Sequence, residues 1–279
     1  MAMDCRCSFV SDDGMERQKG RQRVTHGSPD HLTDFWRDFL VTNGPFDAPS
    51  CFSEHLATSM CAIVMPGQTC LLDVGCGAGI IGVYCLVEYH ARFATFNDIQ
   101  PEAIAVTRAN VSALIAKHRV RAEQVAFSEG SFTDIPTDVV ARHNLIVFNA
   151  PQMPENKLSA ETLETVKSSG VNRLFRLAGA DGLDVTRTFL GWYGNLPEAP
   201  PAVIQLSSFL GLSRIEAVLG QAAVRYKVLS KKEVPLRDMF CDAARLLGTH
   251  EIEDRLLRKR NGSWTKQLLV VSLSRDTEK

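Results

Sequence analysis

The sequence lacks the hallmarks of several protein classes. It has no apolar run of 18 residues, so we expect no membrane-spanning helix. Residues 1–23 contain no apolar core of the kind that a secretory signal needs, which favours the reducing cytoplasm as the setting. The formal net charge is only −1, so no overall field draws the chain to nucleic acid or to an anionic membrane.

Cysteines are present but do not form a metal-binding pattern. The eight cysteines are mostly found within apolar segments, where cysteine behaves as a small hydrophobic residue. Cys5 and Cys7 could together bind a soft metal, but a second pair is missing from the sequence. We therefore expect no metal site.

Two regions differ in composition. Residues 1–28 are polar and predict a mobile tail, and Ser28 to Asp30 then begin a helix whose apolar face includes Trp36. We interpret residues 1–45 as a tail with a short helical cap and residues 46–279 as the main domain. The apolar face of the cap predicts packing against that domain; alternatively it is a lid or a substrate wall, with Trp36 as the candidate contact.

Strands and helices alternate along the main domain. This alternation predicts an α/β fold whose mostly parallel sheet has helices on both faces. Asn261-Gly262 predicts a turn between two antiparallel C-terminal strands, 255–260 and 267–273. The expected helices are 50–63, 79–89, 101–116, 183–193, 211–221 and 239–247, and the other expected strands are 69–74, 93–97, 123–128, 144–148, 203–209 and 223–229.

The chain is organised around a glycine-rich loop. Residues 71–74 predict a buried strand, Gly75, Gly77 and Gly79 a turn in which two glycines could take positive φ, and residues 80–87 the start of a helix. Asp98 ends the next strand, 19 residues beyond Gly79. This combination is typical of a nucleoside-binding crevice, in which the carboxylate accepts hydrogen bonds from both ribose hydroxyls.

Other polar positions fall at the same edge of the predicted sheet. Ser131 and Phe132 follow the third strand, and Asn149 follows the fourth. Ligands of such sheets bind beyond the carboxyl ends of the strands. The convergence at this edge indicates the site more strongly than any single motif.

The glycine loop alone fits either a dinucleotide or S-adenosylmethionine (SAM). The spacing is G-x-G-x-G, and Asp73 stands two residues before the first glycine. A carboxylate would repel a pyrophosphate but attract the α-amino group of a methionine moiety. This favours the sulfonium cofactor.

Several motifs together resemble a known family. Asp73-Val-Gly-Cys-Gly-Ala-Gly79 and Asn97-Asp-Ile-Gln-Pro-Glu-Ala103 are similar to the first two motifs of class I SAM-dependent methyltransferases. Asn149-Ala-Pro-Gln152 resembles the N-P-P-[YF] tetrapeptide of the amino-methylating subset, which includes the HemK/PrmC protein-glutamine methyltransferases. Pro49-Ser-Cys-Phe-Ser-Glu54 and Gly179-Ala-Asp-Gly-Leu183 resemble two further stretches of the HemK/PrmC-like group, whose Rossmann-like fold is then expected here.

The resemblance implies a role for each motif residue. Asn149 and the Ala150 carbonyl would accept hydrogen bonds from the acceptor's N–H groups, so that its lone pair faces the methyl group. Pro151 and Gln152 would complete that tetrapeptide. The residues expected to bind SAM, and its product S-adenosylhomocysteine (SAH), are Asp73, Gly75, Cys76, Gly77, Asp98, Ile99, Ser131, Phe132 and Asn149.

The chain departs from the family pattern at two tetrapeptide positions. Ala150 replaces a proline, and Gln152 replaces an aromatic residue that would stack on a planar acceptor. Gln152 and Met153 instead suggest a smaller or more polar acceptor. With little room for a partner-recognition domain in residues 1–45, we predict N-methylation of a small-molecule amine, with Phe52, Glu54 and Met153 as further candidate contacts.

Other functions stay open. One alternative is methylation of a protein glutamine or an RNA amine, and another is a SAM-binding regulatory or assembly subunit without turnover. A carbon or oxygen acceptor is also open because Gln152 breaks the pattern. Lysines 231–232 and the basic run 255–260 lack interleaved aromatics, so nucleic-acid binding is not favoured. The oligomeric state is open, with a homodimer as one option.

Three residues near the motifs have a plain interpretation beside a functional one. Cys76 is expected to serve only as a small residue of the loop, and Asn110 to cap the end of its helix. His55 could act as a general base, but a neutral imidazole on a helix more often has no chemical role.

Overall fold

A computed structural model gives the fold. The residues that it describes are 50–161, 163–164, 177–222, 224–236, 240–245 and 247–275. The expected helical cap, with Trp36, lies outside the described residues, and so does most of the connection between residues 162 and 176.

The described chain alternates strands and helices as the sequence predicts. The strands are β1 (Cys70–Val74), β2 (Phe93–Asp98), β3 (Val125–Glu129), β4 (Leu145–Phe148), β5 (Ala202–Ser207), β6 (Val224–Pro235), β7 (Arg258–Arg260) and β8 (Ser263–Arg275). The helices are α2 (Cys51–Ser59), α3 (Ile80–Val87), α4 (Pro101–Ala116), α5 (Thr137–Val140), α7 (Asp184–Asn195), α8 (Leu212–Gln221), α9 (Cys241–Arg245) and α10 (Thr249–Asp254).

All eight strands belong to one sheet in the order β3-β2-β1-β4-β5-β8-β6, with β7 paired to β8. The neighbours from β3 to β5 are parallel, and β8 runs antiparallel to both β5 and β6. The chain order reverses between β1 and β4, and this reversal creates a crevice at the carboxyl ends of these two strands. The predicted fold class, a mostly parallel Rossmann-like sheet with antiparallel C-terminal strands, is confirmed.

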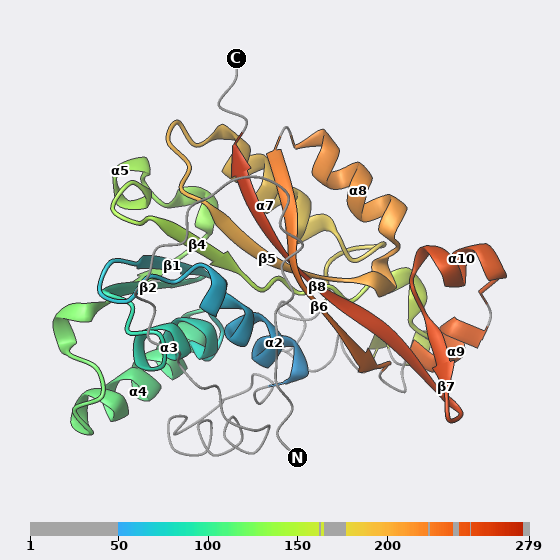
Figure 1. The fold of residues 1–279 in the computed structure, drawn as a ribbon, viewed down its shortest axis with the longest axis horizontal. Helices are drawn as coiled ribbons and strands as arrows, with labels where there is room; N and C mark the ends of the chain where they lie inside the picture. Colours follow the sequence, from blue (N-terminus) through green and yellow to red (C-terminus); the bar gives the residue numbers. More distant parts are fainter. Residues whose placement is uncertain are drawn as a thin grey trace, which may run out of the picture. The chain divides into compact units, whose positions relative to one another are not determined.

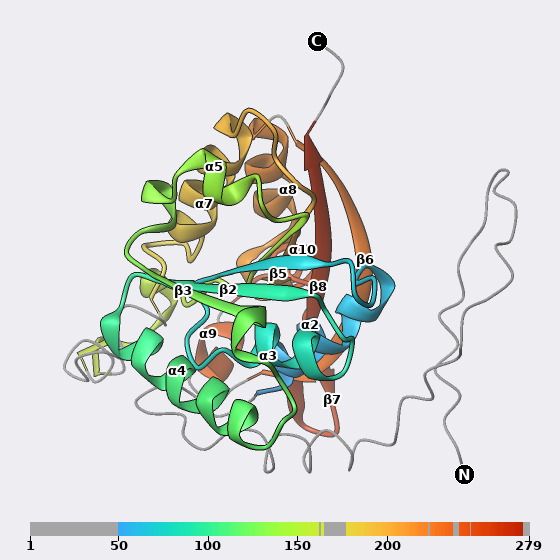
Figure 2. The ribbon, with the colours of Figure 1, turned by 90° about the vertical axis from the view of Figure 1, so that its left-hand side faces the viewer.

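Helices cover both faces of the sheet (Figures 1 and 2). Helices α3 and α4 lie on one face, and α7 and α8 lie on the other. Among the described residues, no helix combines the length and the apolar character that a bilayer crossing requires.

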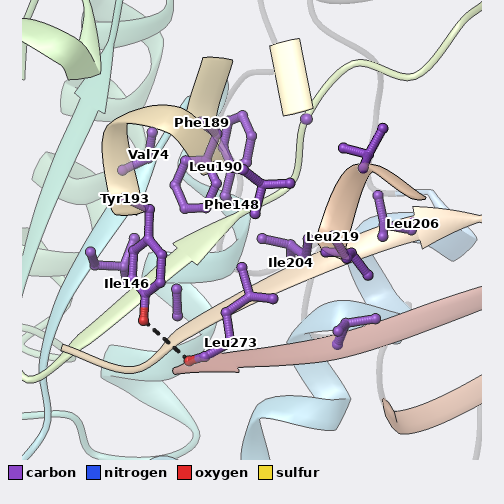
Figure 3. Close-up of a cluster of buried hydrophobic side chains, with 14 of the residues drawn as sticks. Val74, Ile146, Phe148, Phe189, Leu190, Tyr193, Ile204, Leu206, Leu219 and Leu273 are labelled. Carbon is purple, nitrogen blue, oxygen red and sulfur yellow. Dashed lines mark hydrogen bonds between the residues drawn. The ribbon is translucent and has the colours of Figure 1, made fainter. Parts of the chain in front are cut away.

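The core between the sheet and α7/α8 is densely packed with apolar side chains (Figure 3). Ile146 and Ile204 of the sheet contact the same cluster as Leu190 of α7 and Leu219 of α8. The hydroxyl of the fully buried Tyr193 donates a hydrogen bond to the Leu273 carbonyl at 3.3 Å, so this polar group is satisfied inside the core. The core therefore packs β4, β5 and β8 against α7 and α8.

A second apolar cluster lies under the C-terminal part of the chain. It is built from Met153, Leu177, Phe209, Leu236, Phe240, Ala244 and Leu257. Met153 and Leu177 also form an isolated parallel bridge. This cluster joins the segment after β4 to α9 and the end of β6.

The largest differences from the sequence prediction are in the C-terminal part. β6 continues to Pro235, well past the predicted end at residue 229, and β7 is confined to residues 258–260. The predicted helix at 239–247 is instead the short α9, followed by α10. β6 is largely exposed, and a strand with little buried surface has a weak apolar pattern from which to set its length.

Candidate cofactor and substrate site

The glycine loop after β1 makes the tight turn that its sequence predicts. Gly75, Gly77 and Gly79 have φ values of 62°, 56° and 78°, so all three, and not only two, take the left-handed conformation that disfavours side chains. A Cβ at Gly79 would stand 2.7 Å from Thr107 Cγ2, whereas one at Gly77 would meet nothing within 4 Å. Gly77 thus borders open space in which a ligand can approach the backbone.

Asp73 lies beneath the loop. Its side chain is 2% exposed, and Oδ2 accepts a hydrogen bond from the Gly82 backbone N–H at 2.9 Å. Burial raises the pKa of Asp73 to about 7; the hydrogen bond from Gly82 opposes this shift, and the nearby Asp98 carboxylate adds to it. Asp73 therefore connects β1 to the first turns of α3 while also lining the cavity.

Helix α4 braces the loop from behind. Thr107 Oγ1 donates to the Gly77 carbonyl at 2.8 Å, and Asn110 Nδ2 donates to the Ala78 carbonyl at 3.0 Å. The expectation that Asn110 caps its helix is thus wrong, because this buried side chain points across to the glycine loop. Burial, followed by the charges of Asp73 and Asp98, raises the pKa of the Cys76 thiol, which disfavours the nucleophilic thiolate.

Asp98 stands at the end of β2, next to the loop. Its Oδ2 accepts from the Gly77 N–H and its Oδ1 from the Gln100 N–H, both at 2.9 Å. Burial raises the pKa of Asp98, although these backbone hydrogen bonds oppose the shift. Each oxygen retains a second lone pair, so the carboxylate can also accept from the hydroxyls of a bound ribose.

Apolar side chains border the space beside Asp98. Ile99 is 62% exposed, which is unusual for an isoleucine, and its side chain lines the cavity. On the other side, the Phe132 ring packs edge-on against Phe148, with 5.7 Å between the ring centroids. Ser131 precedes it and accepts a hydrogen bond from the Thr133 backbone N–H. These surfaces suit a flat aromatic base.

The segment after β4 is fixed by Gln152. Its Nε2 donates to the Gln205 carbonyl at 2.6 Å, and its Oε1 accepts from the Ser207 backbone N–H at 2.8 Å. Both ends of the side-chain amide are thus bonded to the backbone of β5. Gln152, interpreted from sequence as a contact for a polar acceptor, primarily attaches the tetrapeptide to the neighbouring strand.

The Gly179–Leu183 turn packs against the segment after β4 that contains Gln152. Gly182 has a φ of 83°, and a Cβ there would lie 3.0 Å from the Gln152 carbonyl oxygen and 3.2 Å from the Pro154 nitrogen. Asp181 accepts the Leu183 N–H and pairs with Arg187. Close approach of two backbone segments therefore explains the glycine of this motif.

One cavity of about 560 Å³ unites these features. Phe52 and Met153 also line it, whereas Glu54 does not belong to its wall. All the described residues predicted to bind cofactor or to form the tetrapeptide line it: Asp73, Gly75, Cys76, Gly77, Asp98, Ile99, Ser131, Phe132, Asn149, Ala150, Pro151 and Gln152.

His55 does not have the properties of a general base. It is 5% exposed and is absent from the cavity wall. Burial, followed by the charge of Lys232, lowers the pKa of His55 to about 4. In the described parts of the chain, no group of three or more His, Cys, Asp or Glu side chains is arranged to hold a metal ion.

Sequence reasoning missed one wall of the cavity. This wall comes from α7, from the end of β5 and from the C-terminal part, and includes Asp184, Val185, Thr188, Ser207, Phe209, Phe240 and Lys266. The rule that ligands bind at strand ends could have identified Ser207 and Phe209. No comparable sequence signal marks Phe240 or Lys266, because only the folded sheet brings them to the site.

Comparisons with known proteins bear directly on this site. Residues 52–176 match the family model described as "Methyltransferase small domain". The match includes the glycine loop, Asp98 and the Asn149 tetrapeptide, and it supports the expected SAM-dependent methyltransferase. This part of the chain contains the groups expected for SAM: an open glycine turn, a carboxylate at the end of β2 and an exposed apolar side chain after it.

Curated relatives resemble parts of the chain. A release factor glutamine methyltransferase of Cereibacter sphaeroides is 32% identical over 154 residues, which are 55% of this chain and 50% of the relative. A ribosomal RNA small subunit methyltransferase C of Pasteurella multocida is 27% identical over 129 residues, 43% of this chain and 36% of the relative. The chain thus spans half or less of the length of these relatives.

Among solved structures, the Mtq2–Trm112 complex of E. cuniculi, described as responsible for methylation of the eRF1 translation termination factor, contains a similar chain. Its TM-score is 0.45 at 12% identity, with 83% of this chain and 99% of that chain covered.

Proposed function

We propose that this protein is a SAM-dependent methyltransferase that transfers the methyl group to a nitrogen atom oriented by Asn149. The observation that carries the proposal is a single cavity lined both by the glycine loop with Asp98 and by the Asn149 tetrapeptide. A cofactor held over β1 and β2 and an acceptor held over β4 are thereby adjacent.

The residues of the cavity supply binding and orientation. Asp98 would accept the ribose hydroxyls, and Ile99 and Phe132 would enclose the adenine. Asp73 lies close enough to the loop to favour the cationic methionine amino group. When bound, SAM supplies an activated methyl group to the acceptor's lone pair, with the electrons of the broken C–S bond remaining on sulfur. Because the methyl group is already activated, positioning provides much of the rate.

Asn149 is suited to orient the acceptor. It follows β4 directly, and its side chain is partly exposed in the cavity. Its amide oxygen and the Ala150 carbonyl could accept two N–H bonds from one amino or amide group. The nitrogen lone pair would then face the methyl group, and the nitrogen would release a proton after transfer.

The acceptor itself has two candidates. Our sequence-based proposal is a small-molecule amine, in keeping with the loss of the stacking aromatic at Gln152. The names of the relatives favour a protein glutamine amide or an RNA amine as the second candidate, and the resemblance to the HemK/PrmC-like group points the same way. A cytoplasmic setting and a possible homodimer remain proposals from sequence.

The proposal is tested by separating cofactor binding from methyl transfer. Isothermal titration with SAH should show binding that Asp98→Ala weakens by tenfold or more and Asn149→Ala leaves within about twofold. Release of SAH from SAM should then be measured with small amines, glutamine-containing peptides and ribosomal RNA, and Asn149→Ala should reduce it at least 100-fold. Equal turnover in Asn149→Ala would contradict the assignment; SAH binding without turnover on any acceptor would select the regulatory alternative.

A further inference from the structure

The outermost strand on one side of the sheet, β6, has an open edge. It spans twelve residues, Val224–Pro235, and lies at the limit of the sheet, beyond β8 (Figure 2). In the part of the chain that the structure describes, β8 is its single partner strand. An edge strand presents a row of backbone N–H and C=O groups on its open side. Another extended segment can pair with this row and lengthen the sheet by one strand.

Two apolar side chains are exposed on one face of β6. Tyr226 is 44% exposed and Val228 is 37% exposed, and large hydrophobic residues are exposed at few other described positions. They pair with Leu273 and Val271 of β8, which belong to the apolar cluster between the sheet and α7/α8. Directly opposite residues of an antiparallel pair share a face of the sheet. Tyr226 and Val228 thus continue this apolar face outward to the open edge.

The same strand is basic. It carries three exposed lysines, Lys227, Lys231 and Lys232. The single acid of β6, Glu233, already pairs with Arg260 of β7, with 3.3 Å between the carboxylate oxygen Oε1 and the guanidinium Nε. The open edge therefore favours an acidic occupant.

Apolar and basic side chains alternate between the two faces in the first part of β6. Lys227 stands between Tyr226 and Val228 in the sequence and pairs with Ser272, so it lies on the opposite face from these two residues. The register shifts between Val228 and Ser230, and this irregularity ends the alternation. A complementary strand therefore has apolar residues on one face and acidic residues on the other.

The lysines argue against a second copy of this chain as the occupant. Two paired β6 edges would bring the lysines of both copies together, and like charges opposite each other destabilise a strand pair. Lysine on an edge strand is a known means of preventing such pairing. A nucleic acid strand would neutralise the lysines, but its sugar–phosphate backbone has no N–H groups to donate to the carbonyl oxygens of the edge. An acidic polypeptide satisfies both requirements.

We propose that the open edge of β6 binds an extended segment of a partner protein in which apolar and acidic residues alternate. The main chain of the segment pairs with β6, its apolar side chains contact Tyr226 and Val228, and its acidic side chains contact Lys227 on the other face. Further acidic residues of the segment pair with Lys231 and Lys232. None of the described residues that line the cavity belongs to β6, so the proposal is independent of the proposed methyl transfer.

A synthetic peptide serves as the partner segment in the test. A fluorescein-labelled nine-residue peptide in which glutamate and valine alternate is titrated with the full chain, and binding is followed by fluorescence anisotropy. We expect it to bind tenfold or more tightly than two control peptides. One control has the same composition with its glutamates and valines in separate blocks. The other is the alternating peptide with all its backbone nitrogens methylated, which keeps the charges but cannot donate main-chain hydrogen bonds.

Matched variants connect the binding to β6. Lys227→Glu and Tyr226→Thr change opposite faces of the strand, and each should weaken binding of the alternating peptide fivefold or more. Lys259→Glu, at an exposed position of β7, changes the charge by the same amount and should leave the affinity within twofold of wild type. An undetectable affinity for the alternating peptide, equal binding of the block peptide, or an unchanged affinity in Lys227→Glu would overturn the proposal.

Two further measurements identify another occupant. A wild-type dimer in sedimentation that excludes the peptide would assign the edge of β6 to a second copy of the chain. A single-stranded RNA of nine nucleotides that displaces the peptide and binds more tightly would assign it to nucleic acid. Either result would overturn the proposal, whereas a monomer that binds the peptide more tightly than the RNA supports it.

Discussion

Gln152 shows at the scale of one residue how a departure from a family pattern can be compensated. Its side-chain amide bonds to the backbone of β5 at Gln205 and Ser207, and Gln205 Nε2 in turn donates to the Phe52 carbonyl of α2 at 2.8 Å. The family aromatic would contact a substrate ring at this position. Here the residue instead connects the Asn149 segment, β5 and α2, which together form the proposed acceptor end.

We therefore predict that Gln152→Ala lowers kcat more than it changes KM. The variant leaves a buried carbonyl and a buried N–H of β5 without their partners, which should lower the free energy of unfolding by about 1–3 kcal/mol. SAH affinity, measured by titration, should stay near normal because the glycine loop is unaltered. An unchanged kcat would show that the hydrogen bonds between Gln152 and β5 are not needed to position Asn149.

Gln152→Glu refines this prediction. Glutamate keeps the oxygen that accepts the Ser207 N–H but replaces the donor to Gln205 with a second oxygen that faces a carbonyl. We expect a loss of kcat at least as large as that of Gln152→Ala, and larger at pH 8 than at pH 5, where the acid is more often protonated. A pH-independent loss would mean that the donor is dispensable.

Asp73 predicts a pH dependence of stability. Its pKa is raised by burial from an ordinary value of 3.8 to about 7, so the folded state disfavours its ionisation. Its contribution to the free energy of unfolding is therefore fully present below about pH 4 and is lost as the pH rises to about 7. Urea unfolding should show a decrease in the free energy of unfolding between pH 4.5 and 8. In Asp73→Asn this decrease should be smaller than in the wild type by about 2–4 kcal/mol.

A matched control for this prediction is Asp138→Asn. Asp138 is an exposed residue that pairs with Arg142, and its replacement should leave the pH profile of the wild type unchanged. If Asp73→Asn and Asp138→Asn give the same profile, the decline originates elsewhere in the molecule.

At the scale of elements, α3 packs against β2 through a glycine. A Cβ at Gly82 would lie 2.4 Å from Phe96 Cε1 and 3.0 Å from Asp73 Oδ2. We predict that Gly82→Ala lowers the free energy of unfolding by about 1–3 kcal/mol because the helix must move away from the sheet. It should also weaken SAH binding, since the Gly82 N–H holds Asp73.

Gly191→Ala is the control for this effect. Gly191 lies inside α7, and a Cβ there would meet nothing within 4 Å. The substitution should raise the free energy of unfolding by about 0.4–1 kcal/mol, because alanine is the better helix former. Urea titration of both variants measures their free energies of unfolding. If Gly191→Ala were destabilised, open space around a Cβ would not be enough to predict that a glycine can be replaced by alanine.

Elements with strong local signals were predictable from sequence. α4 runs from Pro101 to Ala116 as expected, because a proline at the first helical position marks its start locally. The parallel strands and the Asn261-Gly262 hairpin turn were predictable for the same reason. β6 was predicted too short because β8 is its single partner among the described strands, so its extent depends on that strand.

The same distinction applies to the site. The glycine loop, Asp98 and Asn149 could be predicted because each directly follows a recognisable strand. Phe52 and Lys266 meet only because β8 inserts beside β5 and α2 packs next to both. Such a contact between residues far apart in sequence leaves no local pattern, so this part of the cavity wall could be found only in the folded chain.

At the scale of the whole molecule, residues of both apolar clusters line the cavity. Trp192 packs against the cluster between the sheet and α7, and Trp264 packs against the C-terminal cluster around Phe209 and Phe240. The ladder between β5 and β8, from Ala202–Leu273 to Ser207–Leu268, connects the two. This arrangement indicates that the described sheet unfolds as one cooperative unit.

We predict that both tryptophans report the same unfolding midpoint. A Trp36→Phe/Trp264→Phe variant leaves Trp192 as the probe, and a Trp36→Phe/Trp192→Phe variant leaves Trp264. In each variant, SAH at 100 times its Kd should raise the free energy of unfolding by about 2.7 kcal/mol, because ligand binding stabilises the whole unit that forms its cavity. Fluorescence-detected urea unfolding gives both values. If the Trp264 transition came first and did not respond to SAH, the C-terminal strands would unfold separately, and the acceptor end could then form or dissolve without disturbing the bound cofactor.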